Sequence, residues 1–270
     1  MDSNKFLIER ILDAVGKKAN LSISDQKIVS DAINDRIRKK PFRVAIIGQS
    51  GVGKSSTLNA VFGVKSYVSD IAEGTTNIEE HIFPMQDGFS LAVYDMPGLN
   101  NDIHRDMEYE VLYKQILPTC DVIVYIINAH SKDIGEDCRI LKEVVVPICR
   151  GNNILPNLIL GINKVDTIGQ AENPNDPELR WDVINNVPTE KLKRCIKIKL
   201  SAISDRLIDE GLVSKEDGID VKRIVFYSAV FNYNLRAFLM AILDTPEGVI
   251  WVGTVGLDRI GKWSDLVLNK

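Results

Sequence analysis

The segment IIGQSGVGKSSTLNAV, residues 46–61, restricts the fold of this chain more than any other stretch. An apolar run leads into a loop with three glycines, and a helical pattern follows the loop. The spacing Gly48-x4-Gly53-Lys54-Ser55 in that setting is typical of a phosphate-binding loop (P-loop), whose backbone N–H groups point inward at phosphate oxygens. Lys54 would place a positive charge on the outer phosphates, and the Ser55 hydroxyl suits Mg²⁺.

This loop predicts a bound nucleotide without identifying its base. The alternative, a glycine-rich turn that binds nothing, is disfavoured by the strand pattern before the loop and the helix pattern after it. We expect the following P-loop residues to contact the nucleotide: Gln49, Ser50, Gly51, Val52, Gly53, Lys54, Ser55 and Ser56.

From Pro41 onward, strand-like apolar runs alternate with helical stretches. Strands are predicted at residues 43–48, 79–85, 89–96, 122–129, 157–166 and 223–230, and helices after Lys54 and at residues 105–117, 136–149 and 235–243. Several strand runs are continuously hydrophobic, as expected for a parallel sheet covered on both faces. Only residues 86–88, of turn type, separate the second and third runs, which favours a hairpin. We therefore predict the α/β fold of a P-loop NTPase: a mostly parallel sheet with one antiparallel edge strand and helices on both faces.

The pattern divides the chain into three parts. Residues 1–40 are predicted to form an N-terminal helical extension of two helices, the second capped at Ser22–Ser24. Residues 41–246 are predicted to form the nucleotide-binding domain, and residues 247–270 a C-terminal segment that packs on it. Within the domain, residues 167–222 are far longer than the usual connection of about 4–6 residues, and we interpret them as a helical insertion.

The composition indicates a globular protein, since the 270 residues are 45% hydrophobic and 26% charged, with a formal net charge of −4. The chain therefore lacks the overall positive charge that would indicate nucleic-acid binding. The first residues are too charged for a signal peptide, and no apolar run reaches the roughly 18 residues of a membrane span. The four cysteines form no CxxC pair, so buried, reduced thiols are expected. These features predict a cytoplasmic protein without a transmembrane segment.

A second motif, Asp95-x-x-Gly98, ends a predicted strand. A carboxylate at the end of a strand beside a P-loop can hold Mg²⁺, usually through water. The Gly98 N–H is placed to meet a terminal phosphate. A threonine at residues 68–81 could complete the Mg²⁺ shell when that phosphate is present, and we choose Thr76 over Thr75. A solvated polar loop is the alternative for this segment.

A third motif, Asn-Lys-Val-Asp, ends another predicted strand. Asp166 can accept hydrogen bonds from both N1–H and the 2-amino group of guanine, whereas adenine offers neither donor, so this pairing selects guanine. Asn163 would brace the loop, and the Lys164 side chain would cover the base. Ser228-Ala229 ends the last predicted strand, where its backbone could meet the guanine carbonyl oxygen.

The ordered set GQSGVGKS, a loop threonine, DMPG, NKVD and SA resembles the five motifs of translation-factor-type GTPases. The stretch from residue 67 to DMPGL is similar to the Era and TrmE branch, although Asn77 stands where that branch usually has an arginine. The sequence DMEYEVLYKQILPTCDVIVYIINA resembles small Era-like GTPases of bacterial prophages and genomic islands, sometimes described as ribosome-binding. The resemblance covers residues 41–245 and implies a G domain that binds GTP and GDP with Mg²⁺ and hydrolyses GTP.

The resemblance also implies roles for the motif residues. Catalytic contributions are implied for Lys54, Thr76 and Gly98, and Mg²⁺ binding for Ser55, Thr76 and Asp95. Guanine recognition is implied for Asn163, Lys164, Asp166, Ser228 and Ala229.

Three features depart from the wider family. Leu99 follows the second motif where Ras-like proteins carry a glutamine that orients the attacking water, and leucine cannot do this. Gly51 stands where some TrmE-branch relatives have an asparagine that binds an activating K⁺, so we predict no strong K⁺ stimulation. No arginine lies in the P-loop or beside Thr76 to neutralise charge in cis, so slow intrinsic hydrolysis is expected. Residues after Leu99 could instead contact the nucleotide, and the candidates are Asn100, Asn101, His104 and Arg105. For His104, the alternative is a position in an exposed loop without such a contact.

These features predict a GTP-dependent switch with slow hydrolysis, accelerated by a partner or by self-association as a homodimer across the nucleotide face. One alternative is a dynamin-like or immunity-related assembling GTPase, although 270 residues hardly accommodate a long helical stalk. Another is a nucleotide-bound scaffold with negligible turnover, which Leu99 keeps open. A ribosome or RNA partner rests on family analogy alone.

Overall fold

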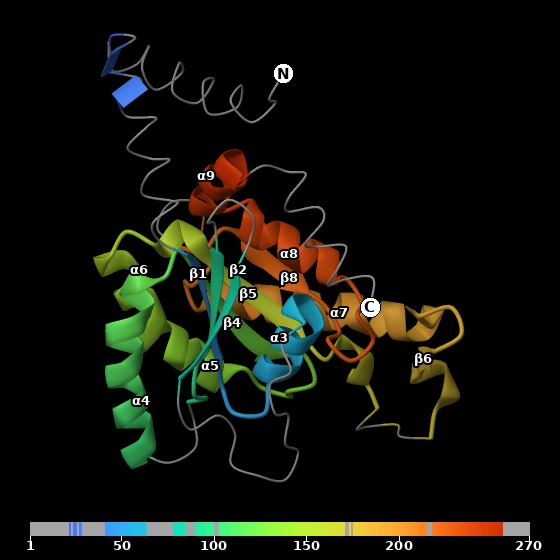
Figure 1. Ribbon diagram of the computed structural model, residues 1–270. Coiled ribbons are helices and arrows are strands. Elements are labelled where there is room, and N and C mark those ends of the chain that lie inside the picture. Colours follow the sequence, from blue (N-terminus) through green and yellow to red (C-terminus); the bar gives the residue numbers. More distant parts are fainter. Residues whose placement is uncertain are drawn as a thin grey trace, which may run out of the picture.

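The computed structural model describes residues 41–63, 78–84, 90–99, 103–170, 173, 175–214 and 218–255, together with residues 22, 24, 25, 27 and 28. Its centre is a six-stranded sheet of order β2-β3-β1-β4-β5-β8, with helices packed around it (Figure 1). The strands are β1 (Phe42–Gly48), β2 (Glu79–Pro84), β3 (Ser90–Asp95), β4 (Val122–Asn128), β5 (Leu158–Asn163) and β8 (Ile224–Phe226). Neighbouring strands of this sheet run parallel except β2 and β3, which run antiparallel. The predicted mostly parallel sheet with one antiparallel edge strand is confirmed.

Helices cover both faces of the sheet, as predicted. The described helices are α3 (Lys54–Phe62), α4 (Ile103–Ile116), α5 (Gly135–Ile140), α6 (Val146–Gly151), α7 (Glu190–Asp209), α8 (Leu235–Leu243) and α9 (Pro246–Val255). Short 3-10 turns lie at Leu117–Thr119, Leu155–Asn157, Val165–Thr167, Pro177–Leu179 and Val221–Arg223. Ala45 and Ile47 of β1 join the core formed with α4 to α7, whereas Val44 and Ile46 join the core formed with α3, α8 and α9. Because successive side chains of a strand face opposite sides, β1 is buried on both faces from Val44 onward.

The helix predicted at residues 136–149 is divided by a wide π-helical turn. α5 ends at Ile140, the turn covers Leu141–Val145, and α6 begins at Val146. Pro147 offers the physical reason, because proline lacks an N–H and its ring would clash with the carbonyl four residues earlier in a regular helix. A wider turn moves the Pro147 ring away from that carbonyl group, so the chain can stay helical.

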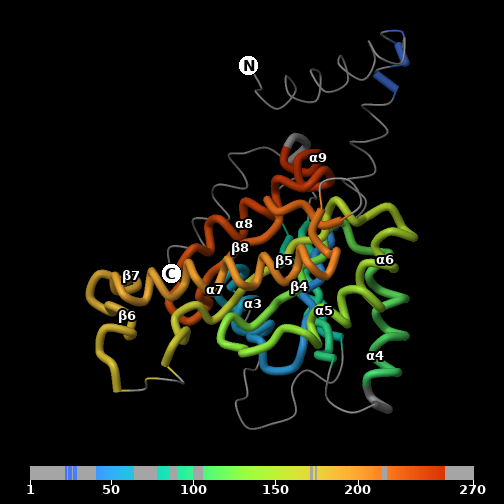
Figure 2. Tube along the Cα trace, turned by 180° about the vertical axis from the view of Figure 1, so that it is seen from behind, coloured from blue at the N-terminus to red at the C-terminus, as the bar shows by residue number. Residues whose placement is uncertain are grey.

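The segment that we interpret as an insertion, residues 167–222, contains α7, the helix that its pattern predicted. Thr189 caps this helix by accepting a hydrogen bond from the Leu192 N–H at 3.3 Å. The insertion also contains a short antiparallel hairpin, β6 (Trp181–Asp182) and β7 (Val187–Pro188), which the pattern did not predict. Strands this short produce no detectable alternation of apolar and polar residues. Figures 1 and 2 show the hairpin beside α7, at the side of the molecule away from α4 and α6.

The predicted terminal segments are described in part. Residues 24, 25, 27 and 28 are helical, and the Ser22 hydroxyl caps them by accepting a hydrogen bond from the Asp25 N–H at 3.2 Å. The rest of residues 1–40 and residues 256–270 lie outside the described residues. α9 packs on the sheet through Trp251, whose ring stacks on Phe42 of β1 with centroids 4.8 Å apart.

The four cysteines carry free thiols, as predicted. Cys120, Cys138 and Cys149 are buried, and Cys195 is half-buried. None of the helices in the described part of the chain combines the length and the apolar composition needed to cross a bilayer.

Candidate nucleotide-binding site

The P-loop leads from the end of β1 into α3, as the sequence predicted. Gly53, directly before α3, takes the left-handed backbone conformation with φ 94°. A Cβ atom at this position would lie 2.5 Å from Asn163 Nδ2, so both the backbone and the neighbouring loop require glycine. The P-loop is therefore in direct contact with the loop that follows β5.

Lys54 begins α3 and folds back over the P-loop. Its Nζ donates hydrogen bonds to the Gln49 carbonyl at 3.0 Å and to the Gly48 carbonyl at 3.4 Å. The residue is 7% exposed, and burial lowers the pKa of Lys54 to about 8, although the Asp95 carboxylate acts in the opposite direction. A buried ammonium of this kind is suited to bind phosphate oxygens, which would supply the missing negative charge.

Asp95 and Ser55 meet beside Lys54, at the end of β3. The Ser55 hydroxyl donates to Asp95 Oδ2 at 2.7 Å, and Asp95 Oδ1 is buried without a hydrogen-bond partner among the described residues. Burial raises the pKa of Asp95, while the Ser55 hydroxyl and the Lys54 ammonium oppose this. The described residues hold no group of three or more His, Cys, Asp or Glu side chains around a metal position. One carboxylate and one hydroxyl nevertheless suit Mg²⁺, which keeps waters and phosphates as its other ligands.

Gly98 lies where the chain after β3 passes the P-loop. A Cβ atom there would lie 2.7 Å from the Ser50 backbone nitrogen and 2.8 Å from Lys54 Nζ, so only glycine allows this approach. The next residue, Leu99, buries its side chain, and its carbonyl accepts a hydrogen bond from the Ser50 N–H at 3.1 Å. A buried leucine offers no polar group to a water molecule, which agrees with the sequence analysis.

Several positions singled out in the sequence lie outside the part of the chain that the structure describes. They are Thr75, Thr76, Asn77, Asn100, Asn101 and the side chains of His104 and Arg105. The Mg²⁺ role of Thr76 therefore stays a prediction.

Asn163 connects three loops. Its Nδ2 donates to the Val52 carbonyl at 3.0 Å, and its Oδ1 accepts from the Ala229 N–H at 3.1 Å. Lys164 adds a second link to the P-loop, since its Nζ donates to the Gly51 carbonyl at 2.7 Å. The P-loop and the loops after β5 and β8 therefore form one connected polar unit.

Asp166 and Ser228 are the buried polar residues of the loops after β5 and β8. Asp166 is 7% exposed, and its Oδ1 is buried without a hydrogen-bond partner among the described residues. Ser228 is fully buried and exchanges two backbone hydrogen bonds with Tyr233, at 3.1 and 3.0 Å, which close its loop. A buried carboxylate oxygen without a donor costs free energy, so a ligand that brings N–H groups fits this position.

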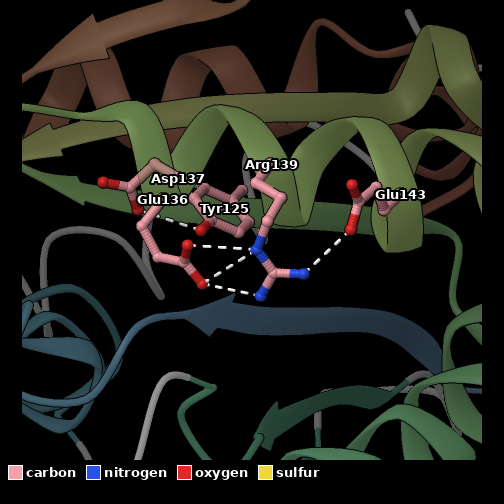
Figure 3. A network of polar contacts seen from close by, with 5 residues as sticks. All are labelled: Tyr125, Glu136, Asp137, Arg139 and Glu143. Atoms are coloured by element: carbon pink, nitrogen blue, oxygen red, sulfur yellow. Dashed lines mark hydrogen bonds and ion pairs between the residues drawn. The ribbon is translucent and has the colours of Figure 1, made fainter.

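The structure adds polar contacts to the P-loop that the sequence pattern did not reveal. The Gln49 side chain hydrogen-bonds the carboxyl group of Asp137 in α5, and the Tyr125 hydroxyl donates to Asp137 Oδ1 at 2.9 Å. Figure 3 shows the contact between Tyr125 and Asp137 next to the exposed ion pairs of Arg139 on the same helix. Burial raises the pKa of Asp137, although the hydrogen bonds from Gln49 and Tyr125 oppose this. Acidic residues are common in the first turn of a helix, so its position carries no signal of burial.

Comparison with known proteins agrees with this geometry. Residues 43–164 match the family described as the 50S ribosome-binding GTPase. The chain is 34% identical over 103 residues to the uncharacterized protein YfjP of Escherichia coli K12, a match that covers 38% of this chain and 36% of YfjP. It is 26% identical over 229 residues to the GTPase Era of Thermotoga maritima, a match that covers 77% of this chain and 74% of that protein. The chain therefore spans little more than a third of the first of these relatives.

The fold is also similar to a crystal structure of Era from Aquifex aeolicus bound to GDP·AlF4⁻. The TM-score is 0.54 at 23% sequence identity, and the match covers 76% of this chain and 57% of the other. The structural likeness shows the fold, and the family match covers the P-loop, the Asp95–Gly98 motif and the first two residues of the third motif, Asn163 and Lys164. The predicted resemblance to Era-like P-loop GTPases is confirmed: residues 43–164 are similar to a GTPase family, and the fold is similar to that of an Era structure.

Proposed function

We propose that this chain binds GTP and GDP together with Mg²⁺ and hydrolyses GTP to GDP and phosphate. The observation that carries the proposal is a pair of buried carboxylates, Asp95 and Asp166, each with one oxygen that no described residue satisfies. Asp95 ends β3 and Asp166 follows β5, and both strands run parallel to β1 in the sheet, so the two carboxylates lie at the same edge of the sheet as the P-loop. This arrangement fits a ligand with a metal-bound phosphate chain at one end and an N–H-bearing base at the other.

The donor set beside the P-loop fits Mg²⁺. We infer that Ser55 binds the ion directly and that Asp95 holds it through water, since the Ser55 hydroxyl already donates to Asp95 Oδ2 and Asp95 Oδ1 has no partner among the described residues. Thr76 would complete the set in the GTP state. When bound, the ion supplies positive charge that neutralises the phosphate oxygens.

Lys54 and the P-loop N–H groups would stabilise the negative charge that develops on the phosphates during hydrolysis. A water oxygen forms a bond to the γ-phosphorus, and the bond from that phosphorus to the β–γ bridging oxygen breaks. The products are GDP and inorganic phosphate, and the protons of the water pass to the phosphate product and to solvent. Gly98 would direct its N–H at the γ-phosphate. Because the buried Leu99 side chain cannot position the water, the intrinsic rate is expected to be slow.

The proposed biological role is a nucleotide-dependent switch in the cytoplasm. Gly98 touches the P-loop, so the segment after it would differ between the GTP and GDP states. Self-association across the nucleotide face or a partner would accelerate turnover by supplying the missing groups. The description of the matched family supports a ribosomal partner by analogy. Because Gly51 has no side-chain oxygen for K⁺, we expect exchange of Na⁺ for K⁺ to change the rate little.

The first test is GTP turnover per protein molecule over a wide range of protein concentration, with Lys54→Ala as the inactive control. Slow turnover that is independent of concentration and absent in the control is expected for a monomeric switch. Specific activity that rises with concentration would show that two copies complete each other's sites. Wild-type protein that neither binds GTP nor releases phosphate at any concentration would refute the proposed function.

A further inference from the structure

The loop after β8 is covered by the hairpin of the insertion. The Trp181 indole of β6 stacks on the Phe231 ring, with centroids 4.8 Å apart and planes 17° from parallel. Tyr233 meets the same indole edge-on, at 5.1 Å and 76°. Trp181 is 7% exposed, so its ring fills the space between the inserted hairpin and the loop that begins with Ser228.

Asn186 of the hairpin turn fixes this contact with two hydrogen bonds. Trp181 Nε1 donates to Asn186 Oδ1 at 3.0 Å, and Asn186 Nδ2 donates to the Phe231 carbonyl at 3.1 Å. The hairpin therefore holds the backbone of Phe231 as well as its ring. A stacked ring whose polar edge is also bonded has one preferred orientation.

The loop after β8 requires such support because its own backbone is costly. Asn232 and Asn234 have φ values of 51° and 59°, in the left-handed region that residues other than glycine occupy at a cost, which is smaller for asparagine than for most residues. Val230 is 73% exposed and contributes little packing. The aromatic contacts with Trp181 supply the packing that offsets this cost.

The insertion is also bonded to the residues proposed to recognise the base. The Phe231 N–H donates to Ser228 Oγ at 3.2 Å, so the stacked residue fixes the side chain at the start of the loop. On the other side, Gln170 Nε2 donates to the Asp166 carbonyl at 2.7 Å. The insertion therefore contacts both loops between which the guanine base is proposed to bind.

We propose that Trp181 is a positioning residue for guanine recognition: stacked on Phe231, it holds the loop of Ser228 and Ala229 in place for the base, and the β6–β7 hairpin responds when the base binds. The inference rests on the proposed function and goes beyond it, because it makes the insertion part of the nucleotide-binding apparatus. It also predicts which property depends on Trp181. The base is common to GTP and GDP, so Trp181 should affect the affinity for both equally and leave the hydrolytic step of bound GTP unchanged.

The test compares Trp181→Ala with a matched control, Trp251→Ala. Both substitutions remove a nearly parallel stack, since Trp251 lies on Phe42 at 4.8 Å and 16°, but α9 contains none of the residues proposed to bind the nucleotide. We expect Trp181→Ala to weaken GDP and GTP binding by the same factor, about three- to tenfold, which is the range for one aromatic contact. Trp181→Phe should restore most of the affinity, and Trp251→Ala should bind both nucleotides as the wild type does. The kcat at saturating GTP should be unchanged in all three variants.

Fluorescence of Trp181 measures whether the hairpin responds to the bound base, and it leaves the stack of Trp181 on Phe231 intact. The chain has three tryptophans, Trp181, Trp251 and Trp263. In a Trp251→Phe/Trp263→Phe background, the emission of Trp181 should change on addition of GDP and stay constant with ADP. If Trp181→Ala does not fold, this fluorescence measurement tests the inference by itself.

Two results would overturn the inference while leaving the proposed function intact. One is GDP binding by Trp181→Ala within about twofold of the wild type, together with constant Trp181 emission. The other is an equal loss of affinity in Trp251→Ala, which would mark the effect as general destabilisation. If the wild-type protein binds no guanine nucleotide at all, the proposed function itself fails.

Discussion

Lys54 carries a charge that its buried position makes costly, and this predicts a pH dependence of nucleotide binding. Burial lowers the pKa of Lys54 to about 8, and phosphates bind the protonated form, so above that pH the protein must take up a proton to bind GDP. We expect the Kd for GDP to be constant near pH 7 and to rise above about pH 8, by at most about tenfold per pH unit. Calorimetry in buffers of different ionisation enthalpy measures both the affinity and the proton uptake.

The control for this prediction is Lys54→Ala, which should bind GDP weakly and show no comparable pH dependence over the same range. A wild-type affinity that stays constant from pH 7 to well above the pKa of Lys54 would contradict the assigned role of this ammonium group.

Asp166 predicts a change of base specificity by a single substitution. Its carboxylate offers two acceptors, whereas asparagine offers one acceptor and one donor. Xanthine has a carbonyl group where guanine has its 2-amino group, so Asp166→Asn should weaken GDP binding by at least about 100-fold and improve binding of xanthosine diphosphate. Competition binding with both nucleotides measures the change. Asp166→Ala, which supplies neither group, should bind both poorly, and a guanine preference retained by Asp166→Asn would refute the assignment.

At the scale of elements, helix α5 is linked to the P-loop through a buried acid. Asp137 of α5 accepts hydrogen bonds from Gln49 and Tyr125, yet burial raises its pKa above the model-peptide value of 3.8. The nearby carboxylates of Glu136 and Asp133 act in the same direction as burial. The folded protein therefore holds the Asp137 proton to a higher pH than the unfolded chain does. Its contribution to stability is full below about pH 4 and is lost as the pH rises through the raised pKa.

Asp137→Asn should remove this loss, because the amide keeps the shape of the carboxyl group and does not ionise. We expect the free energy of unfolding of the variant to improve relative to the wild type as the pH rises from about 4 to 7. Tyr125→Phe should instead destabilise by about 1–3 kcal/mol at neutral pH, because it removes a donor from a buried carboxylate. Urea denaturation at several pH values measures both effects, and parallel pH profiles for Asp137→Asn and the wild type would argue against the buried ionisation.

Local pattern was sufficient for most elements of the sheet but not for two features of the helical regions. Apolar runs within strands of six or seven residues identify β1, β3, β4 and β5, because strands covered on both faces have no polar side. The π-helical turn before Pro147 was not predicted, because a single wider turn does not change the helical spacing of apolar residues enough to be detected. The β6–β7 hairpin was not predicted, because strands of two residues show no alternation of apolar and polar side chains. Its stability comes from Trp181 packing on a loop from another part of the chain.

At the scale of the whole molecule, α9 closes the core beneath β1. Trp251 is 3% exposed and stacks on Phe42. Trp251→Ala should therefore destabilise the protein, by about 3 kcal/mol, the lower end of the range for such a cavity. The lower end is expected because the buried Trp251 Nε1 has no hydrogen-bond partner among the described residues, and its removal is favourable.

Thermal or urea unfolding measures this loss, and Trp251→Phe provides the comparison. Phenylalanine keeps an aromatic ring for the stack and removes the unsatisfied N–H, so we expect a much smaller change than for alanine. Equal destabilisation by both substitutions would show that the size of the indole, and not the stack, holds α9 in place.

The nucleotide motifs could be read from the chain alone because each is a short segment whose chemistry lies in its own residues. The P-loop needs only its glycines, Lys54 and Ser55 between a strand and a helix, and the orientation of a parallel sheet places Asp95 and Asp166 at the same edge. The contacts of Gln49 with Asp137 and of Trp181 with Phe231 join residues far apart in sequence, and no local spacing encodes them. Burial is likewise a property of the assembled core, so the lowered pKa of Lys54 and the unsatisfied oxygens of the two carboxylates became visible only after the elements had packed. Short-range pattern therefore predicts which groups would meet a nucleotide, and long-range packing decides what holds those groups in position.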